Sequence, residues 1–136
     1  MATRGAIGIE NQDGTVTGIY SHWDSYPEHN GKILVENYTN EEKVRELISL
    51  GNVSVLAPSI GEAQDFDSPV KGTCVFYGRD RDEEEQEAVT LHSAKKFVKY
   101  FDNEYHYLFR NGVWFVSCNG DDWEEVSVVL AADETA

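Results

Sequence analysis

The stretch from His22 to Tyr26 gathers an imidazole, an indole, a carboxylate and a phenol within a few positions. His22 and Asp24 are two positions apart, so both side chains project from one face if the chain is extended there. Such a pair could bind a metal ion, or the carboxylate could orient the imidazole. A metal site needs a further ligand, and no HxxxH or comparable spacing supplies it. We therefore predict no metal site and assign no catalytic residue; the competing interpretation is a polar cluster that holds a strand-to-helix connection.

Arginines stand out because the chain has only 11 basic residues. Arg79 and Arg81 lie two positions apart, and a guanidinium can bind a phosphate through two parallel hydrogen bonds. Aromatic side chains supply flat surfaces on which a nucleotide base can stack. The alternative is that both arginines only neutralise their acidic neighbours. The predicted ligand-binding residues have a charged, polar or aromatic side chain of these kinds. They are His22, Trp23, Asp24, Tyr26, Arg79, Arg81, Arg4 and Tyr77.

Other familiar catalytic and cofactor motifs do not occur in the sequence. There is no GxSxG nucleophile motif and no glycine-rich phosphate loop that precedes a helix. Cys74 and Cys118 have no CxxC spacing and lie in strand-like runs, which favours buried free thiols. We therefore predict no cofactor. An enzyme, such as a metal-dependent phosphodiesterase that uses His22 and Asp24, is only the third hypothesis.

The chain has 136 residues, of which 11 are basic and 25 acidic, so its net charge is −14. This length is typical of a single domain with a core of its own. An acidic protein repels nucleic-acid phosphates, so direct nucleic-acid binding is not expected. The charge fits a solvated surface, an acidic face for a basic protein, or a mimic of the DNA backbone. The sequence has neither a signal-peptide core nor an apolar run of about 20 residues, so we expect a cytoplasmic protein without membrane contact.

Two pairs of β-prone runs are separated by turn sequences. Residues 6–10 and 15–20 flank an Asp-Gly turn, and residues 104–110 and 113–118 flank an Asn-Gly turn. Both turns predict β-hairpins, because glycine readily adopts the positive φ that tight hairpin turns require. The alternation in residues 104–110 places tyrosines and Phe109 on one face of the strand and His106 and Leu108 on the other.

Helical patterns occupy much of the remaining chain. Residues 29–37 and 93–101 carry apolar side chains at helical spacing. Between them, Thr39 begins a capping box and Gly51 has the position of a helix C-terminal glycine. Residues 123–130 favour a helix over an edge strand only weakly, because their valines favour β structure.

The chain is expected to form one α+β domain over residues 1–130, followed by a flexible tail at residues 131–136. Residues 52–69 are expected to form a loop, residues 72–77 a strand, and the acidic run at residues 80–87 a solvated loop. Hairpins predominate over crossovers in this order of elements. We therefore predict an antiparallel sheet built from hairpins, with three or four helices packed against it.

The sequence resembles a group of small, largely uncharacterised bacteriophage proteins. The resemblance is carried by DGTVTGIY at residues 13–20, HWD at residues 22–24, Tyr-Pro at residues 26–27 and YGRDR at residues 77–81, and it covers nearly the whole chain. Many members have a cysteine where this chain has Ser21, which argues against a nucleophile at that position. The resemblance implies a phage or phage-derived gene product and carries no activity with it.

Two hypotheses of different classes follow from these observations. The first is a phage-encoded, non-enzymatic binding protein that acts in counter-defence by sequestering a nucleotide-type signal in the host cytoplasm. The second is an acidic inhibitor or DNA mimic that docks on a basic host protein, for which complementary charge would make encounter salt-sensitive. A homo-oligomer is expected by analogy with small proteins that bind ligands between subunits.

Overall fold

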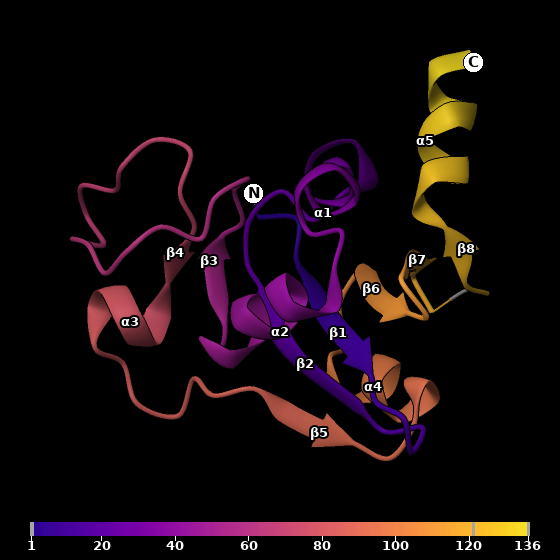
Figure 1. Cartoon of the computed structure of the whole chain (residues 1–136), viewed down its shortest axis with the longest axis horizontal. Helices are drawn as coiled ribbons and strands as arrows, with labels where there is room; N and C mark the ends of the chain where they lie inside the picture. Colours follow the sequence, from indigo (N-terminus) through magenta and orange to yellow (C-terminus); the bar gives the residue numbers. More distant parts are fainter. Residues whose placement is uncertain (1, 121, 136) are drawn as a thin grey trace.

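The computed structural model describes residues 2–120 and 122–135 of the chain. In this part, eight strands form one sheet in the order β4-β3-β2-β1-β6-β7-β8, and β5 also pairs with β2 (Figure 1). Helices accompany the sheet, which confirms the predicted α+β class. The strands are β1 (Gly5–Glu10), β2 (Val16–Ser21), β3 (Val53–Val55), β4 (Val75–Phe76), β5 (Val89–Leu91), β6 (Tyr105–Arg110), β7 (Val113–Cys118) and β8 (Glu124–Glu125).

Both predicted hairpins form. β1 pairs antiparallel with β2, and β6 pairs antiparallel with β7. Gly14 in the first turn has φ +87°, and Asn111 and Gly112 in the second have φ 52° and 79°. Positive φ at both central residues is the type I′ geometry that Asn-Gly favours.

The sheet is mostly antiparallel, as predicted, and two of its strand pairs are parallel. β1 runs parallel to β6, so the two hairpins lie side by side with the first strand of one paired to the first strand of the other. β2 also runs parallel to the short strand β3, through Ser21 and Val53. These two pairings join segments that are far apart in the chain, whereas hairpin signals specify only neighbouring strands.

The helices agree with the sequence in type and differ in detail. They are η1 (Pro27–Gly31), α1 (Lys32–Asn37), α2 (Glu41–Ser49), α3 (Tyr77–Arg81), α4 (Ala94–Tyr100) and α5 (Val126–Thr135). The predicted helix at residues 29–37 therefore begins as a π-helical turn. α2 is capped by Asn40, whose side chain accepts a hydrogen bond from the Lys43 amide at 2.8 Å, and not by Thr39. Gly51 has φ +84° directly after α2, as predicted.

The segment before the acidic run differs most from expectation. The loop predicted at residues 52–69 contains β3, and the strand predicted at residues 72–77 is reduced to Val75–Phe76. The next five residues, Tyr77–Arg81, form the short helix α3. Asp80 explains the early change, because its Oδ2 accepts a hydrogen bond from the Phe76 amide at 2.8 Å. The carboxylate thereby bends the chain into a turn at the point where the strand would continue.

The C-terminal segment combines both interpretations of residues 123–130. A two-residue strand, β8, pairs with β7 at the edge of the sheet, and α5 follows immediately. α5 extends to Thr135 and rises away from the sheet (Figure 1), so it includes most of the predicted tail; residue 136 lies outside the described residues. Within the described residues, we find no helix whose length and apolar character would let it cross a lipid bilayer.

The two faces of the sheet carry separate cores, as the alternation predicts. Ile7 and Ile9 pack with Tyr107 and Phe109 in one core, to which α2 also contributes. The other core contains Leu108 and belongs to the face covered by α4. Because side chains alternate along a strand, each hairpin contributes to both cores.

Two strand glycines make room for α4. Phe97 of α4 is completely buried against the sheet. A Cβ atom at Gly8 would lie 3.0 Å from Phe97 Cζ, and one at Gly18 would lie 2.5 Å from Phe97 Cε1. Only glycine permits this close approach, so Gly8 and Gly18 provide the space in which the Phe97 ring packs against the first hairpin.

Candidate functional site

His22 and Trp23 leave the sheet where β2 ends. After Ser21, the chain still runs along β3: the His22 amide donates to the Val53 carbonyl and the Trp23 amide to the Ser54 carbonyl, both at 3.1 Å. The strand direction then changes at Asp24, whose φ of 57° is left-handed. Asp24 therefore does not continue the extended run that would place its carboxylate on the same face as His22.

A buried amide holds this connection in place. Asn30 is 1% exposed, and its Nδ2 donates to the Trp23 carbonyl at 3.0 Å and lies within 3.3 Å of the hydroxyls of Ser21 and Ser25. The Tyr107 hydroxyl also donates to the Ser25 carbonyl at 2.6 Å. These contacts fix the backbone from inside, while the Trp23 ring remains 41% exposed. The connection is thus a rigid support for an exposed indole.

Tyr20, and not Asp24, orients the His22 imidazole. The Tyr20 hydroxyl lies 2.7 Å from His22 Nδ1. Burial, and more weakly the nearby Tyr77, raise the pKa of Tyr20 although Arg4 opposes this, so the phenol stays protonated at neutral pH. We therefore assign the phenol as the donor and Nδ1 as the acceptor, which leaves the proton on Nε2.

His22 is neutral at neutral pH for two physical reasons. Burial disfavours the imidazolium, and the positive charge of Arg4 disfavours it further, so the pKa of His22 lies below its usual value. The His22 ring meets the Trp23 indole edge to face, with centroids 4.8 Å apart. Arg4, His22 and Trp23 thus combine a guanidinium, an oriented N–H donor and an exposed aromatic surface.

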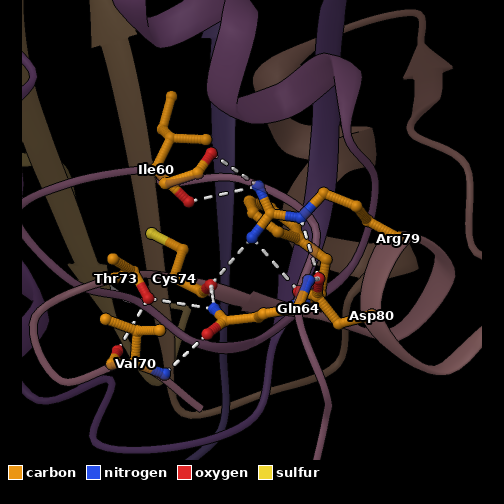
Figure 2. A network of polar contacts seen from close by, with 9 residues as sticks. Ile60, Gln64, Val70, Thr73, Cys74, Arg79 and Asp80 are labelled. Atoms are coloured by element: carbon orange, nitrogen blue, oxygen red, sulfur yellow. Dashed lines mark hydrogen bonds and ion pairs between the residues drawn. The ribbon is translucent and has the colours of Figure 1, made fainter.

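Arg79 has a different role, shown in Figure 2. Its Nε donates to Asp80 Oδ1 at 3.0 Å, and Nη1 donates to the carbonyls of Ile60 and Gly61 at 3.2 and 2.9 Å. Nη2 donates to the Cys74 carbonyl at 3.1 Å and to Asp80 Oδ2 at 3.2 Å. Because a guanidinium has five N–H groups, no donor remains for a ligand. Arg79 holds the loop of residues 56–74 against α3, and we leave it out of the proposed site.

Asp80 completes this network. Its side chain is fully buried and accepts hydrogen bonds from Arg79, from the Phe76 amide and from the Gln64 amide at 2.9 Å. Burial opposes ionisation, but these donors outweigh it and lower the pKa of Asp80. Gln64 extends the network, since its Nε2 donates to Thr73 and its Oε1 accepts from Val70 (Figure 2).

Arg81, two positions further, lies over aromatic rings. Its guanidinium is 4.4 Å from the Phe66 ring centroid and 5.2 Å from that of Tyr77, and it also pairs with Glu83. Half of the Arg81 side chain is exposed. Asn52 connects Tyr77 to Tyr20: its side-chain oxygen accepts from the Tyr20 amide at 2.8 Å and its carbonyl accepts from the Tyr77 amide at 3.3 Å.

The eight predicted residues therefore do not form one pocket. Arg4 and His22 act on each other, Trp23 contacts His22, and Tyr77 links this group to Arg81. Asp24 contributes its backbone carbonyl to Asn30. Tyr26 packs against His29 with ring centroids 6.0 Å apart.

Sequence reasoning missed two residues that shape the site. Tyr20 has the same two-residue spacing from His22 as Asp24 does, and it precedes the turn, so it shares the strand face. The spacing alone could have indicated it. Asn30 gave no such signal, because its role depends on where the helical turn places it.

Metal binding finds no support in the described residues, in which no group of three His, Cys, Asp or Glu side chains is placed to hold an ion. Comparisons with known protein families, with curated proteins and with solved structures found no match for this chain.

Proposed function

We propose that the protein binds, without turnover, a ligand that joins an anionic phosphate to a flat aromatic base. The observation that carries the proposal is the constellation of Arg4, His22 and Trp23 at the end of β2. Arg4 supplies positive charge, His22 Nε2 supplies a fixed N–H donor, and Trp23 supplies a stacking surface. This is the donor set that nucleotide recognition uses.

Binding without chemistry fits the surroundings of His22. The imidazole is hydrogen-bonded to a phenol whose own pKa is raised, so it is paired with neither an activated nucleophile nor a carboxylate. Together with the resemblance to phage proteins, this supports sequestration of a host nucleotide signal as the role of the site.

The test measures binding of nucleotides by thermal shift and calorimetry. We expect one or more cyclic or linear ribonucleotides to raise the melting temperature; a ligand at about 100 times its dissociation constant adds about 2.7 kcal/mol. Trp23→Ala should weaken binding by about 1–3 kcal/mol, the usual contribution of base stacking, and Arg4→Gln should also weaken it.

Two variants control for general effects of lost charge and lost aromatic surface. Lys32→Gln removes an exposed cation from α1, and Tyr100→Ala removes a ring that is 58% exposed on α4. Both should leave nucleotide affinity unchanged. Absence of a shift with every nucleotide, or equal losses in the control variants, would contradict the proposal.

A second candidate function is an acidic inhibitor of a basic host protein. Arg79 binds the carbonyls of Ile60 and Gly61, and Arg81 packs on Phe66, so two acidic segments, residues 62–67 and 82–87, are held together. A DNA mimic should displace a short DNA duplex from a host DNA-binding protein, less effectively at high salt. If it does so, Glu84→Gln with Glu87→Gln should weaken the competition; failure to displace DNA at low salt would remove this candidate.

A further inference from the structure

A polar surface cavity of about 340 Å³, open to solvent, has Arg4 in its lining. It is lined by Arg4, Asp102, Asn103, Glu104 and Asn119. Cavities of this size hold small-molecule ligands or parts of them. The mixture of one cation, two carboxylates and two amides can bind hydroxyl or amino groups.

The sheet register explains why these residues meet. Gly5 pairs with Ser21 on one side and with Tyr105 on the other. Arg4 precedes Gly5, His22 follows Ser21 and Glu104 precedes Tyr105. The same register therefore places Arg4 between His22 and Glu104. The cavity and the His22 site are thus neighbours across one end of the sheet.

The outer wall of the cavity is fixed by backbone contacts. Tyr105 pairs with Cys118, and the Asn119 amide donates to the Glu104 carbonyl at 2.7 Å. At the end of α4, the Asn103 amide donates to the Phe101 carbonyl, also at 2.7 Å. These contacts fix the backbone that carries the lining residues, and Asn103 Nδ2 also donates to the Gly5 carbonyl at 3.4 Å.

The charged groups that line the cavity form no close ion pair with one another among the described residues. Among the described residues, no ion pair within 4.0 Å joins Arg4 to Asp102 or to Glu104. Arg4 is exposed and has no hydrogen bond in the described part of the chain. Its guanidinium therefore remains available to a ligand that spans both sides.

We infer that this cavity receives a second, hydroxyl-bearing group attached through the phosphate of the nucleotide bound at Arg4, His22 and Trp23. The inference rests on the proposed function and names its ligand class. The order Trp23, His22, Arg4, cavity places the phosphate in the middle, with the base on one side and a sugar on the other. A mononucleotide has no group beyond its phosphate that could enter the cavity.

The chemistry of the cavity favours a sugar over a second phosphate. Carboxylates accept hydrogen bonds from sugar hydroxyls, as they do from ribose in dinucleotide-binding proteins. Asp102 and Glu104 would repel a phosphate monoester placed between them. A phosphate already linked to a second group carries less charge and can stay at Arg4. The shared chemistry is a sugar linked through phosphate, supplied either by a second nucleoside or by a nucleotide sugar.

The experiment compares three classes of ligand by calorimetry on the full chain. The probes are the four ribonucleoside 5′-monophosphates, the four homodinucleotides ApA, CpC, GpG and UpU, and the nucleotide sugars ADP-glucose and UDP-glucose. We expect a homodinucleotide or a nucleotide sugar to bind about tenfold more tightly than the monophosphate of the same base, which corresponds to about 1.4 kcal/mol. The class that shows the gain identifies the source of the second sugar.

Two double variants, each of which removes two negative charges, test whether the second sugar binds in this cavity. Asp102→Asn with Glu104→Gln should abolish the gain without weakening monophosphate binding, because the lost carboxylates repel phosphate. Glu36→Gln with Glu46→Gln, which removes two exposed carboxylates of α1 and α2, should keep the gain. Monophosphates that bind as tightly as the larger ligands would overturn this inference and leave the proposed function standing. If no probe binds, this inference falls, and the proposed function falls with it only if cyclic nucleotides also fail to bind.

Discussion

Arg79 and Arg81 are two positions apart but have different roles in this protein. Arg79 is 13% exposed and donates five hydrogen bonds to a buried carboxylate and three backbone carbonyls. Arg81 is half exposed and lies over two aromatic rings. The difference arises from what surrounds each guanidinium, because both have the same charge and donor geometry.

The two arginines should therefore differ in their effect on stability. Arg79→Ala leaves the fully buried Asp80 without its cation, so we expect the free energy of unfolding to fall by about 3 kcal/mol. Arg81→Ala removes an exposed ion pair and should cost less than about 1 kcal/mol. Urea denaturation measures both. Equal losses would show that the network around Asp80 does not carry the stability we assign to it.

The charge of Arg4 should be visible in the titration of His22. Removing that charge by Arg4→Gln should raise the pKa of His22, because one of the two factors that disfavour the imidazolium disappears. NMR titration of the imidazole measures the shift, and Lys32→Gln serves as the control. An unchanged pKa in Arg4→Gln would place Arg4 too far away to share a ligand with His22.

The same lowered pKa has a consequence for stability. The folded protein binds the His22 proton less readily than the unfolded chain does. The contribution of His22 to stability is therefore fully present above the unfolded pKa and is lost as the pH falls from there through the lower pKa of the folded state.

At the scale of elements, contact between α4 and the first hairpin depends on missing side chains. Phe97 lies over Gly8 and Gly18, and the Phe97 ring contacts the rings of Phe101 and His106. Two glycines in neighbouring strands weaken a sheet locally. The buried ring that they accommodate offsets this cost by burial of apolar surface.

Gly18→Ala tests this contact. Its Cβ would lie 2.5 Å from Phe97 Cε1, so we expect overpacking that lowers the free energy of unfolding by about 1–3 kcal/mol. Phe97→Leu in the same chain should recover part of the loss. Gly78→Ala is the matched control, since the nearest atom is 3.8 Å away and no strain follows. A tolerated Gly18→Ala would mean that α4 can shift without cost.

At the scale of the whole molecule, the sheet order creates the candidate site. Glu104 is far in sequence from Arg4 and His22, and the three meet because β1 lies between β2 and β6. The net charge of −14 repels anions at long range, so a phosphate ligand must be held by local donors. Arg4 provides such a donor at an end of the sheet where it has no carboxylate within ion-pairing distance among the described residues.

The sequence by itself determined the two hairpins, the type of most helices and the two faces of β6. Each of these depends on neighbouring residues: Asn111-Gly112 adopts positive φ locally, and the alternation around Tyr107 separates the cores whatever lies beyond. Only the tertiary structure decided that β1 pairs with β6. It also decided that Arg79 donates hydrogen bonds to backbone carbonyls of a loop that is distant in sequence. These features arise from contacts between segments far apart in sequence, which local patterns do not encode.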